Sequence, residues 1–585
     1  MAKFLKSQYC IAFLALASTF LNAMGELWQF SASRFIQSEK SLLLSIAFIG
    51  LFVLYKKYWA KKASVFIWIL AMFVSIGSVL YHLHINDVNH IFQKLTVMRG
   101  IILLLLLISN VTLFKCCFSM LAALLIPREK QHLKLNEVWK LYIFLAFLSL
   151  PAYIALYPGS IQWDNGTMLQ MAYGLKPLTA DNPVFHTGLM YLVKQVASLT
   201  SATFAVALYT FIQLQLQNLL FAHLLWRIQK HNVVLRNTLL VFYFALPVFS
   251  NYASSLGKDL PFALAIASFS MVLLDMIDTE NIQPTQKNHV GLALYSVLLI
   301  VLRNIGIYLW LASIVPLLIY LFVQHKPYAL RTLVIAIVCL SLTFGLQTIA
   351  MQALHITKEK SAANKSIQLQ QIARILKVYG KEALSPEEQY AINTVFPIQK
   401  AIEKYHSGYA DYTKDLFDEN ASKENITAFQ KAYKNIGMRY PLEYIKATYL
   451  NSYAYYIPGI YSNLKPEYFY GNNYIENISI FTPKEQGNFS SIYKMVYGLL
   501  RRLPLLNIIN SSGFSQCLHF AILLFLLFKR KYKYILVMLP ILLYGIGLIA
   551  SPINGYYRYC LPSIYSMGIG LAILGKIIKN SQKSI

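Results

Sequence analysis

Residues 138–156 read VWKLYIFLAFLSLPAYIAL, and the ten residues that follow, 157–166, read YPGSIQWDNG. The first stretch is apolar apart from Lys140 and is long enough to cross the hydrocarbon core of a bilayer. The second stretch is polar, turns at Pro158 and Gly159, and contains Asp164. An aspartate directly outside a membrane span is often a functional group. The two stretches together predict a membrane protein with a candidate site at the end of this span.

The composition of the whole chain supports the same class. The 585 residues are 57% hydrophobic and 13% charged, with a mean hydropathy of +0.49, which excludes a soluble protein. The net charge of +27 does not indicate nucleic-acid binding, because the dense Lys and Arg clusters lie in short loops between apolar runs. We expect anionic membrane lipids to be the counter-charge. The six cysteines lie in or beside apolar runs without metal-ligand spacing, which predicts small buried side chains.

The apolar runs predict an all-α polytopic membrane protein with about 14 transmembrane helices. They lie near 9–25, 41–56, 63–83, 98–125, 138–156, 203–226, 234–254, 259–277, 289–302, 305–323, 330–352, 514–528, 534–552 and 556–578. Residues 3–24, with Lys3 and Lys6 before an apolar core, also fit a signal peptide. We interpret them as an uncleaved first span, because further spans follow at once.

Loop charge orients the chain with both termini in the cytoplasm, since every dense basic loop between spans then lies inside. These loops carry Lys56, Lys57, Lys61, Lys62, Arg128, Lys130, Lys134, Arg227, Lys230, Arg236, Lys326, Arg331, Lys529, Arg530, Lys531, Lys533, Lys576, Lys579 and Lys583. The orientation requires that residues 183–202 form an amphipathic interfacial helix, whereas an ordinary span is the alternative. It also requires two short spans in 289–323 that turn at Arg303-Asn304, because one long span would bury Arg303 in hydrocarbon.

Four regions follow from this topology. Residues 1–137 form an N-terminal extension of about four spans, and residues 138–352 form a transmembrane core whose first outer loop is 157–202. Residues 353–513 are long enough for an extracytoplasmic domain, mostly helical, with helical patterns at 366–380, 385–405 and 422–450. Residues 514–585 return to the membrane. The many tyrosines in 444–470 suit either an interfacial aromatic belt or sugar stacking.

The orientation places several polar residues on the outer face. Asp164 can act as a general base on an acceptor hydroxyl or hold a divalent cation such as Mg or Mn, and helix capping is the alternative role. Lys258, Arg303 and Arg558 stand at span ends, where they can grip a lipid phosphate or simply reach the lipid headgroups. We interpret Asp181 as a residue at a helix start before Pro183, and a second acidic role is the alternative. The chain contains no nucleotide-binding motif, so an outer-face reaction needs a lipid-carried activated group.

The ordered motifs resemble those of a poorly characterised bacterial multi-span family that is similar to the GT-C membrane glycosyltransferases. They are Tyr157-Pro-Gly…Asp164…Gln170, Asn182-Pro…His186-Thr, Gln370-Gln-Ile-Ala-Arg374 and Arg558-Tyr…Leu-Pro562. The resemblance covers about 138–580 and implies a GT-C-like core in the bacterial inner membrane, with Asp164 as the catalytic aspartate of the first outer loop. Where many GT-C loops have paired acidic residues or a His-Pro pair, this chain has Asn182-Pro183, so a metal requirement is left open.

The resemblance implies transfer of a sugar from a polyprenyl-phosphate donor to a glycan, lipid or protein acceptor on the outer face. Asp164 is then the base, and Lys258, Arg303 and Arg558 hold the donor phosphate. We expect further substrate contacts from Gln170, Asp181, His186, Asp259, Gln370, Gln371 and Arg374. Two alternatives stay open: a polymerase or ligase of lipid-linked glycans, and a transporter or flippase of such glycans, although the paired halves typical of transporters are not evident.

Overall fold

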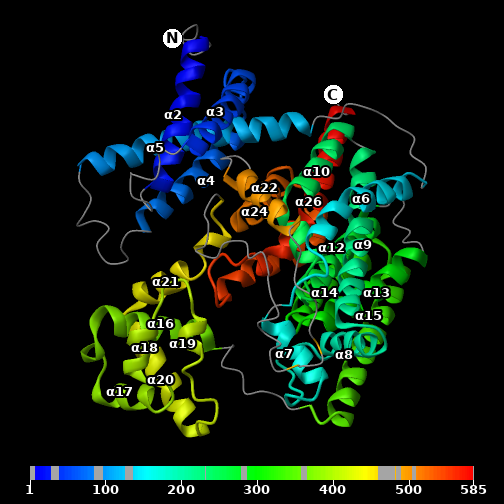
Figure 1. Cartoon of the computed structure of the whole chain (residues 1–585), viewed down its shortest axis with the longest axis vertical. Coiled ribbons are helices and arrows are strands. Elements are labelled where there is room, and N and C mark those ends of the chain that lie inside the picture. The colour runs from blue at the N-terminus through cyan, green and yellow to red at the C-terminus, as the bar shows by residue number, and fades with distance from the viewer. Residues whose placement is uncertain are drawn as a thin grey trace.

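The computed structural model is all-α (Figure 1). It describes residues 7–27, 38–84, 97–125, 136–161, 163–230, 232–278, 286–356, 365–458, 478, 481, 489–502 and 509–583. Lys3, Lys6, the basic residues of 128–134 and the aromatic residues of 461–470 lie outside these ranges, so the expectations placed on them stay predictions.

Every predicted apolar run falls on a helix. The N-terminal ones are α2 (Gln8–Leu27), α3 (Ser38–Tyr58), α4 (Val65–His84) and α5 (Val97–Leu124). Those of the core are α6 (Asn136–Ala155), α9 (Ala202–Gln229), α10 (Val233–Ala245), α11 (Pro247–Ala253), α12 (Asp259–Asp278), α13 (Gln286–Leu302), α14 (Gly306–Gln324), α15 (Lys326–Ala353), α24 (Ser512–Phe528), α25 (Lys533–Gly547) and α26 (Tyr557–Lys583).

Eight helices in the described part of the chain are long and apolar enough to cross a membrane. The pair α10 and α11, bent by 57° at Leu246, makes a ninth when it is counted as one broken span. Four other runs contain shorter apolar helices, in α2, α4, α13 and α24. The structure therefore supports a polytopic membrane protein, whereas the number of 14 spans stays a prediction.

The centre of the core is α12, which packs against α9, α13, α25 and α26. Its most apolar stretch is 78% buried inside the protein, and that of α26 is 89% buried, whereas the figure for α6 and α15 is 17%. Small residues on α12, such as Ala263 and Ala267, allow neighbouring helices to approach closely. The helices α6 and α15 therefore form the periphery of the core, and α12 and α26 form its interior.

The chain turns between α13 and α14 at Arg303–Ile305, as the sequence predicts. The turn is tight enough that a Cβ atom on Gly306 would lie 1.8 Å from the carbonyl oxygen of Leu299, so a larger residue would force the turn apart. The expected amphipathic helix is α8 (Val184–Leu199). Its buried side includes Met190 and Val193 and packs near α7 (Trp163–Ala172) and α9.

Residues 366–450 form a separate helical cluster, here called the α16–α21 group (Figure 1). It contains α16 (Ser366–Tyr379), α17 (Pro386–Asn393), α18 (Ile398–Lys404), α19 (Asp411–Lys414), α20 (Lys423–Arg439) and α21 (Pro441–Leu450). The predicted helix start at Ser385-Pro386 is confirmed, with a capping box between Ser385 and Glu388. The limits of the four predicted regions themselves stay predictions.

A buried ion pair stands inside this group. Arg374 Nε lies 2.8 Å from Glu443 Oε2, and the two side chains are 1% and 8% exposed. Lys446 holds the other carboxylate oxygen of Glu443 at 2.7 Å. Because a buried charge without its partner is costly, this pair links α16 to α21.

We expect Arg374→Ala to destabilise the α16–α21 group by about 3 kcal/mol, at the low end for a broken buried pair because Lys446 still neutralises Glu443. The matched control is Arg439→Ala, whose half-exposed side chain pairs with Glu388 on the same group and should cost less than about 1 kcal/mol. Denaturant unfolding of the purified protein measures both. Equal losses for the two variants would contradict a structural role for Arg374.

Candidate functional site

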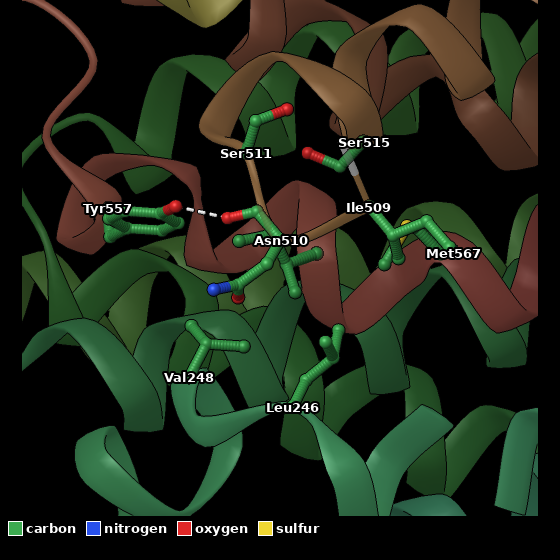
Figure 2. A pocket seen from close by; sticks show the side chains of 9 residues that line it. Leu246, Val248, Ile509, Asn510, Ser511, Ser515, Tyr557 and Met567 are labelled. Atoms are coloured by element: carbon green, nitrogen blue, oxygen red, sulfur yellow. Dashed lines mark hydrogen bonds between the residues drawn. The ribbon is translucent and has the colours of Figure 1, made fainter. Parts of the chain in front are cut away.

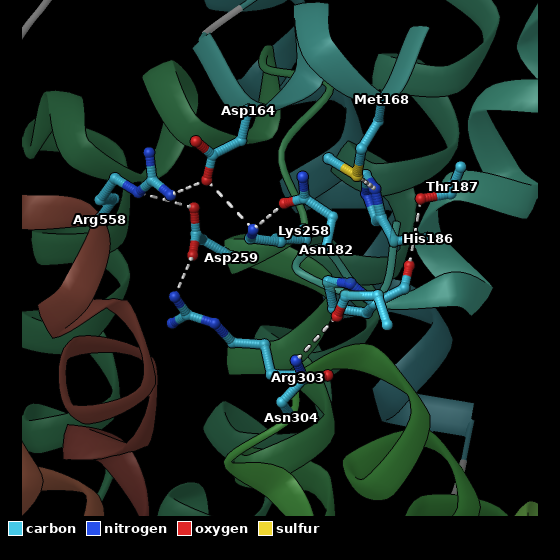
Figure 3. A network of polar contacts seen from close by, with 12 residues as sticks. Asp164, Met168, Asn182, His186, Thr187, Lys258, Asp259, Arg303, Asn304 and Arg558 are labelled. Carbon is cyan, nitrogen blue, oxygen red and sulfur yellow. Dashed lines mark hydrogen bonds and ion pairs between the residues drawn. The ribbon is translucent and has the colours of Figure 1, made fainter. Parts of the chain in front are cut away.

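Five residues from distant parts of the chain form one ion-pair chain with alternating charges, here called the charge network (Figure 3). Lys258 Nζ lies 3.1 Å from Asp164 Oδ2, and Arg558 contacts the same oxygen. Arg558 Nε lies 3.2 Å from Asp259 Oδ2, and Arg303 lies 3.3 Å from Asp259 Oδ1. Lys258 and Arg558 therefore contact the sequence-predicted base Asp164, and Arg303 joins the same network through Asp259.

Helix starts bring these residues together. Asp164 is in the first turn of α7, Asp259 is the first residue of α12, and Arg558 is the second residue of α26. Lys258 directly precedes α12, and Arg303 is in the turn between α13 and α14. The start of a helix carries unpaired N–H groups and a partial positive charge. The ends of α7, α12 and α26 therefore add to the cations in favouring negative charge here.

The charge network has three cations and two carboxylates, so its formal charge is 3 − 2 = +1. Lys258, Asp259 and Arg558 are all under 10% exposed, whereas 34% of the Asp164 side chain is accessible. A ligand can therefore approach the network at Asp164, and the surplus positive charge makes an anion the favoured ligand.

The cations determine the protonation state of Asp164. Burial alone would raise its pKa, but the charges of Arg558 and Lys258 outweigh burial and hold the pKa well below its usual range. Burial lowers the pKa of Lys258, and Asp164 opposes that shift. Asp164 is therefore an ionised carboxylate and a weak base for as long as both cations contact it. An anion that occupies Lys258 and Arg558 would restore its basicity.

Uncharged side chains hold the cations in place. The amide oxygen of Asn182 accepts a hydrogen bond from Lys258 at 2.5 Å, and Arg303 donates to the Tyr544 hydroxyl at 3.1 Å. The centroid of the Tyr559 ring lies 5.8 Å from the guanidinium carbon of Arg303 and 5.1 Å from that of Arg558. The sequence did not reveal these roles. The available signals were the place of Asn182 in the motif Asn182-Pro…His186-Thr and that of Tyr559 directly after Arg558.

Other predicted site residues lie near the charge network without joining it. His186 is fully buried, with Nε2 3.1 Å from the Tyr209 hydroxyl and Nδ1 3.4 Å from the Met168 sulfur. Gln170 is on α7, six residues after Asp164. Asp181 is exposed in the loop before α8, where partial burial and the nearby Glu419 raise its pKa.

The remaining predicted residues are in the α16–α21 group. Gln370 donates to the His406 carbonyl at 2.6 Å, and Gln371 donates to the Thr448 hydroxyl at 2.9 Å. Arg374 is in its ion pair with Glu443. These three side chains make contacts inside the group, and the structure does not bring them to the charge network.

One loop connects the α16–α21 group to the charge network. Residues 551–556 directly precede α26, and Asn554 in this loop is hydrogen-bonded to the α16–α21 group and to the residues that follow it. Its N–H donates to the Gly408 carbonyl at 2.9 Å, its amide nitrogen to the Leu450 carbonyl at 3.2 Å, and its amide oxygen accepts from the Ala454 N–H at 3.0 Å. Arg558 follows four residues later. The position of Arg558 is therefore set both by the hydrogen bonds of this loop and by its own ion pairs with Asp164 and Asp259.

A divalent cation does not fit this site. The oxygens of Asp164 and Asp259 already face guanidinium and ammonium groups, and the surplus positive charge opposes a further cation. Over the ranges that the structure describes, no three His, Cys, Asp or Glu side chains are grouped to hold a metal ion.

A small cavity lies beside the start of α26 (Figure 2). It is lined by Leu246, Val248, Ile509, Asn510, Ser511, Ser515, Tyr557, Ile564 and Met567. The Tyr557 hydroxyl donates to the Asn510 carbonyl at its edge. Two of the lining residues, Leu246 and Val248, are at the break between α10 and α11. This placement is consistent with the rule that irregular backbone within a membrane is buried in protein.

The fold and the charge network together define an all-α polytopic membrane protein with a buried, net positive polar site at the ends of its core helices. The chain belongs to a family of unknown function, DUF6020, whose model matches residues 8–584. No curated protein and no solved structure matches the chain.

The burial of His186 predicts a pH dependence of stability. Burial, with a smaller contribution from Lys258, lowers its pKa to about 3, below the value near 6.5 of an unfolded histidine. The unfolded state therefore binds more protons between these values, and stability is lost as the pH falls below about 6.5. At pH 5 the loss from this residue is about 2 kcal/mol. We expect His186→Asn to flatten the stability profile from pH 7 to pH 5, and an unchanged slope would contradict this role.

Proposed function

We propose that the protein is a membrane glycosyltransferase that moves a sugar from a polyprenyl-phosphate donor to an acceptor on the outer face of the membrane. The observation that supports this proposal most is the charge network. It combines an accessible carboxylate with buried cations at the ends of membrane helices, where a lipid phosphate and an acceptor hydroxyl can meet. A GT-C-like core and the outer-face location belong to the same proposal.

The donor phosphate would bind at Lys258 and Arg558. Guanidinium groups match phosphate oxygens geometrically, and the formal charge of +1 offsets the single negative charge of a phosphodiester. By taking these two cations the phosphate would release Asp164 from its ion pairs. The carboxylate would then become a competent base only when the donor is present.

The chemical step follows from this arrangement. The acceptor hydroxyl oxygen attacks the anomeric carbon of the donor sugar, and Asp164 takes the hydroxyl proton. The bond between the anomeric carbon and the phosphate oxygen breaks, and its electron pair leaves with the polyprenyl phosphate. Lys258 and Arg558 stabilise the negative charge that grows on that oxygen, and Arg303 holds Asp259, which orients Arg558.

A polymerase or ligase would use the same cations with a pyrophosphate carrier and would make long products. A transporter of lipid-linked glycans is favoured by a different observation: α12 has ion pairs at both ends. Asp259 pairs at its start, and Asp275 near its end pairs with Arg227 through two contacts of 2.6 Å. A transporter would move the glycan and leave its structure unchanged.

We expect Asp164→Asn to lower product formation by about 10²- to 10⁴-fold, the usual range for loss of a general base. Binding of the donor lipid should persist or tighten, because Lys258 and Arg558 lose an internal competitor. Mass spectrometry of glycans and lipids from cells that express equal amounts of wild type and variant measures the product. Binding of polyprenyl phosphate to the purified proteins measures the affinity.

The matched control is Asp275→Asn, which removes the carboxylate partner of Arg227 at the opposite end of α12 and should leave the chemistry intact. An unchanged glycan profile in the Asp164→Asn cells would remove Asp164 as the base and favour the transporter. Accumulation of short chains in place of long ones would favour the polymerase.

A further inference from the structure

The segment 406–414 of the α16–α21 group lies against the loop that leads to Arg558. Tyr409 forms an isolated antiparallel bridge with Ile553, and the Ala410 N–H donates to the Pro552 carbonyl at 2.7 Å. The N–H of Asn554 donates to Gly408, as described above. Figure 1 shows α19 on the side of the group that faces the core. Hydrogen bonds therefore hold the segment against the loop that leads to Arg558.

The segment presents an aromatic surface. The rings of Tyr409 and Tyr412 are stacked, with centroids 4.9 Å apart and an angle of 16°. His406 meets both rings edge-on, at 5.8 and 6.4 Å. Although Tyr412 packs on Tyr409, it is 51% exposed. A flat ring with a fixed orientation and a solvent-exposed part suits the apolar face of a sugar.

The residues next to Tyr412 on α19 form an ion pair. Lys414 Nζ lies 2.7 Å from Asp411 Oδ1 and 3.7 Å from Asp415. The positive charge of Lys414 also acts on the carboxylate of Asp181, in the loop before α8, where it opposes the rise of the Asp181 pKa. A carboxylate accepts hydrogen bonds and an ammonium group donates them, so the pair can hold neighbouring hydroxyl groups.

We propose that Tyr412, Asp411 and Lys414 form a saccharide-binding site that holds a pyranose ring of the acceptor. The C–H face of the ring would lie on Tyr412, and its hydroxyls would contact Asp411 and Lys414. The local formal charge of Asp411, Asp415 and Lys414 is 1 − 2 = −1, so the site disfavours phosphate, in contrast to the charge network. The identification of the saccharide as the acceptor rests on the proposed function, whereas saccharide binding itself does not.

The test uses the full-length protein in lipid nanodiscs and saturation-transfer NMR with four neutral probes: maltotetraose, cellotetraose, mannotetraose and chitotetraose. We expect at least one probe to bind wild type and Tyr412→Ala to weaken that binding by about tenfold. Tyr412→Phe should bind as wild type does, since it keeps the ring. The isosteric Asp411→Asn should also weaken binding, and it tests the site without removing the stacked pair.

The matched control is Tyr390→Ala, which removes a tyrosine that is 76% exposed on α17 of the same group and should leave binding unchanged. Thermal unfolding of each variant shows that it is folded. The proposal is overturned if none of the four probes binds wild type, or if both Tyr412→Ala and Asp411→Asn bind as wild type does.

Asp164→Asn separates this proposal from the proposed function. If the variant binds the probe normally and loses sugar transfer, both proposals hold. If it binds the probe and its glycan products are unchanged, the saccharide site stands and the transferase proposal fails. If transfer depends on Asp164 but binding is unaffected by Tyr412→Ala and Asp411→Asn, the transferase proposal stands and the saccharide site fails.

Discussion

The attraction between three cations, two of them buried, and two carboxylates constrains the whole core. Each of these charges would be costly to bury without its partner, so Lys258, Asp164, Arg558, Asp259 and Arg303 have to be brought together. For these residues to meet, the starts of α7, α12 and α26 must lie near one another, and the chain must turn between α13 and α14. This one electrostatic requirement accounts for the short α7, the turn at Arg303 and the hydrogen-bonded loop before α26.

Local features of the fold were predictable from the sequence, because they depend on neighbouring residues. The apolar runs became helices, the chain turns at Arg303, and Ser385 starts a helix. Two of the three candidate cations, Lys258 and Arg558, also contact Asp164. Contacts between distant segments were not predictable: Arg374 finds Glu443 69 residues away inside the α16–α21 group, and Asn182 finds Lys258 76 residues away. Periodicity and motif spacing contain no information on such tertiary partners.

The two proposed ligand sites differ in the sign of their charge and in their chemistry. The charge network is net positive and buried, so it favours a phosphate at the ends of the core helices. The surface around Tyr412 is aromatic, half-exposed and net negative, so it favours an uncharged sugar. The loop with Asn554 links them, since it contacts Gly408 in the segment before Tyr412 and leads to Arg558. A donor and an acceptor could therefore be sorted by electrostatics alone before either reaches the reactive position.

The contact between Asp164 and Arg558 joins residues that are 394 positions apart. At usual rates of protein synthesis Arg558 emerges about 20–80 s after Asp164. During that interval Asp164 and Asp259 have to be accommodated with Lys258 and Arg303 alone, in a core that has no α26. The last helix in the chain therefore completes the packing of α12 and adds the cation that makes the network net positive. A chain that stops before α26 would keep two cations and two carboxylates, with a formal charge of 2 − 2 = 0, and would therefore lack the surplus positive charge that favours an anion.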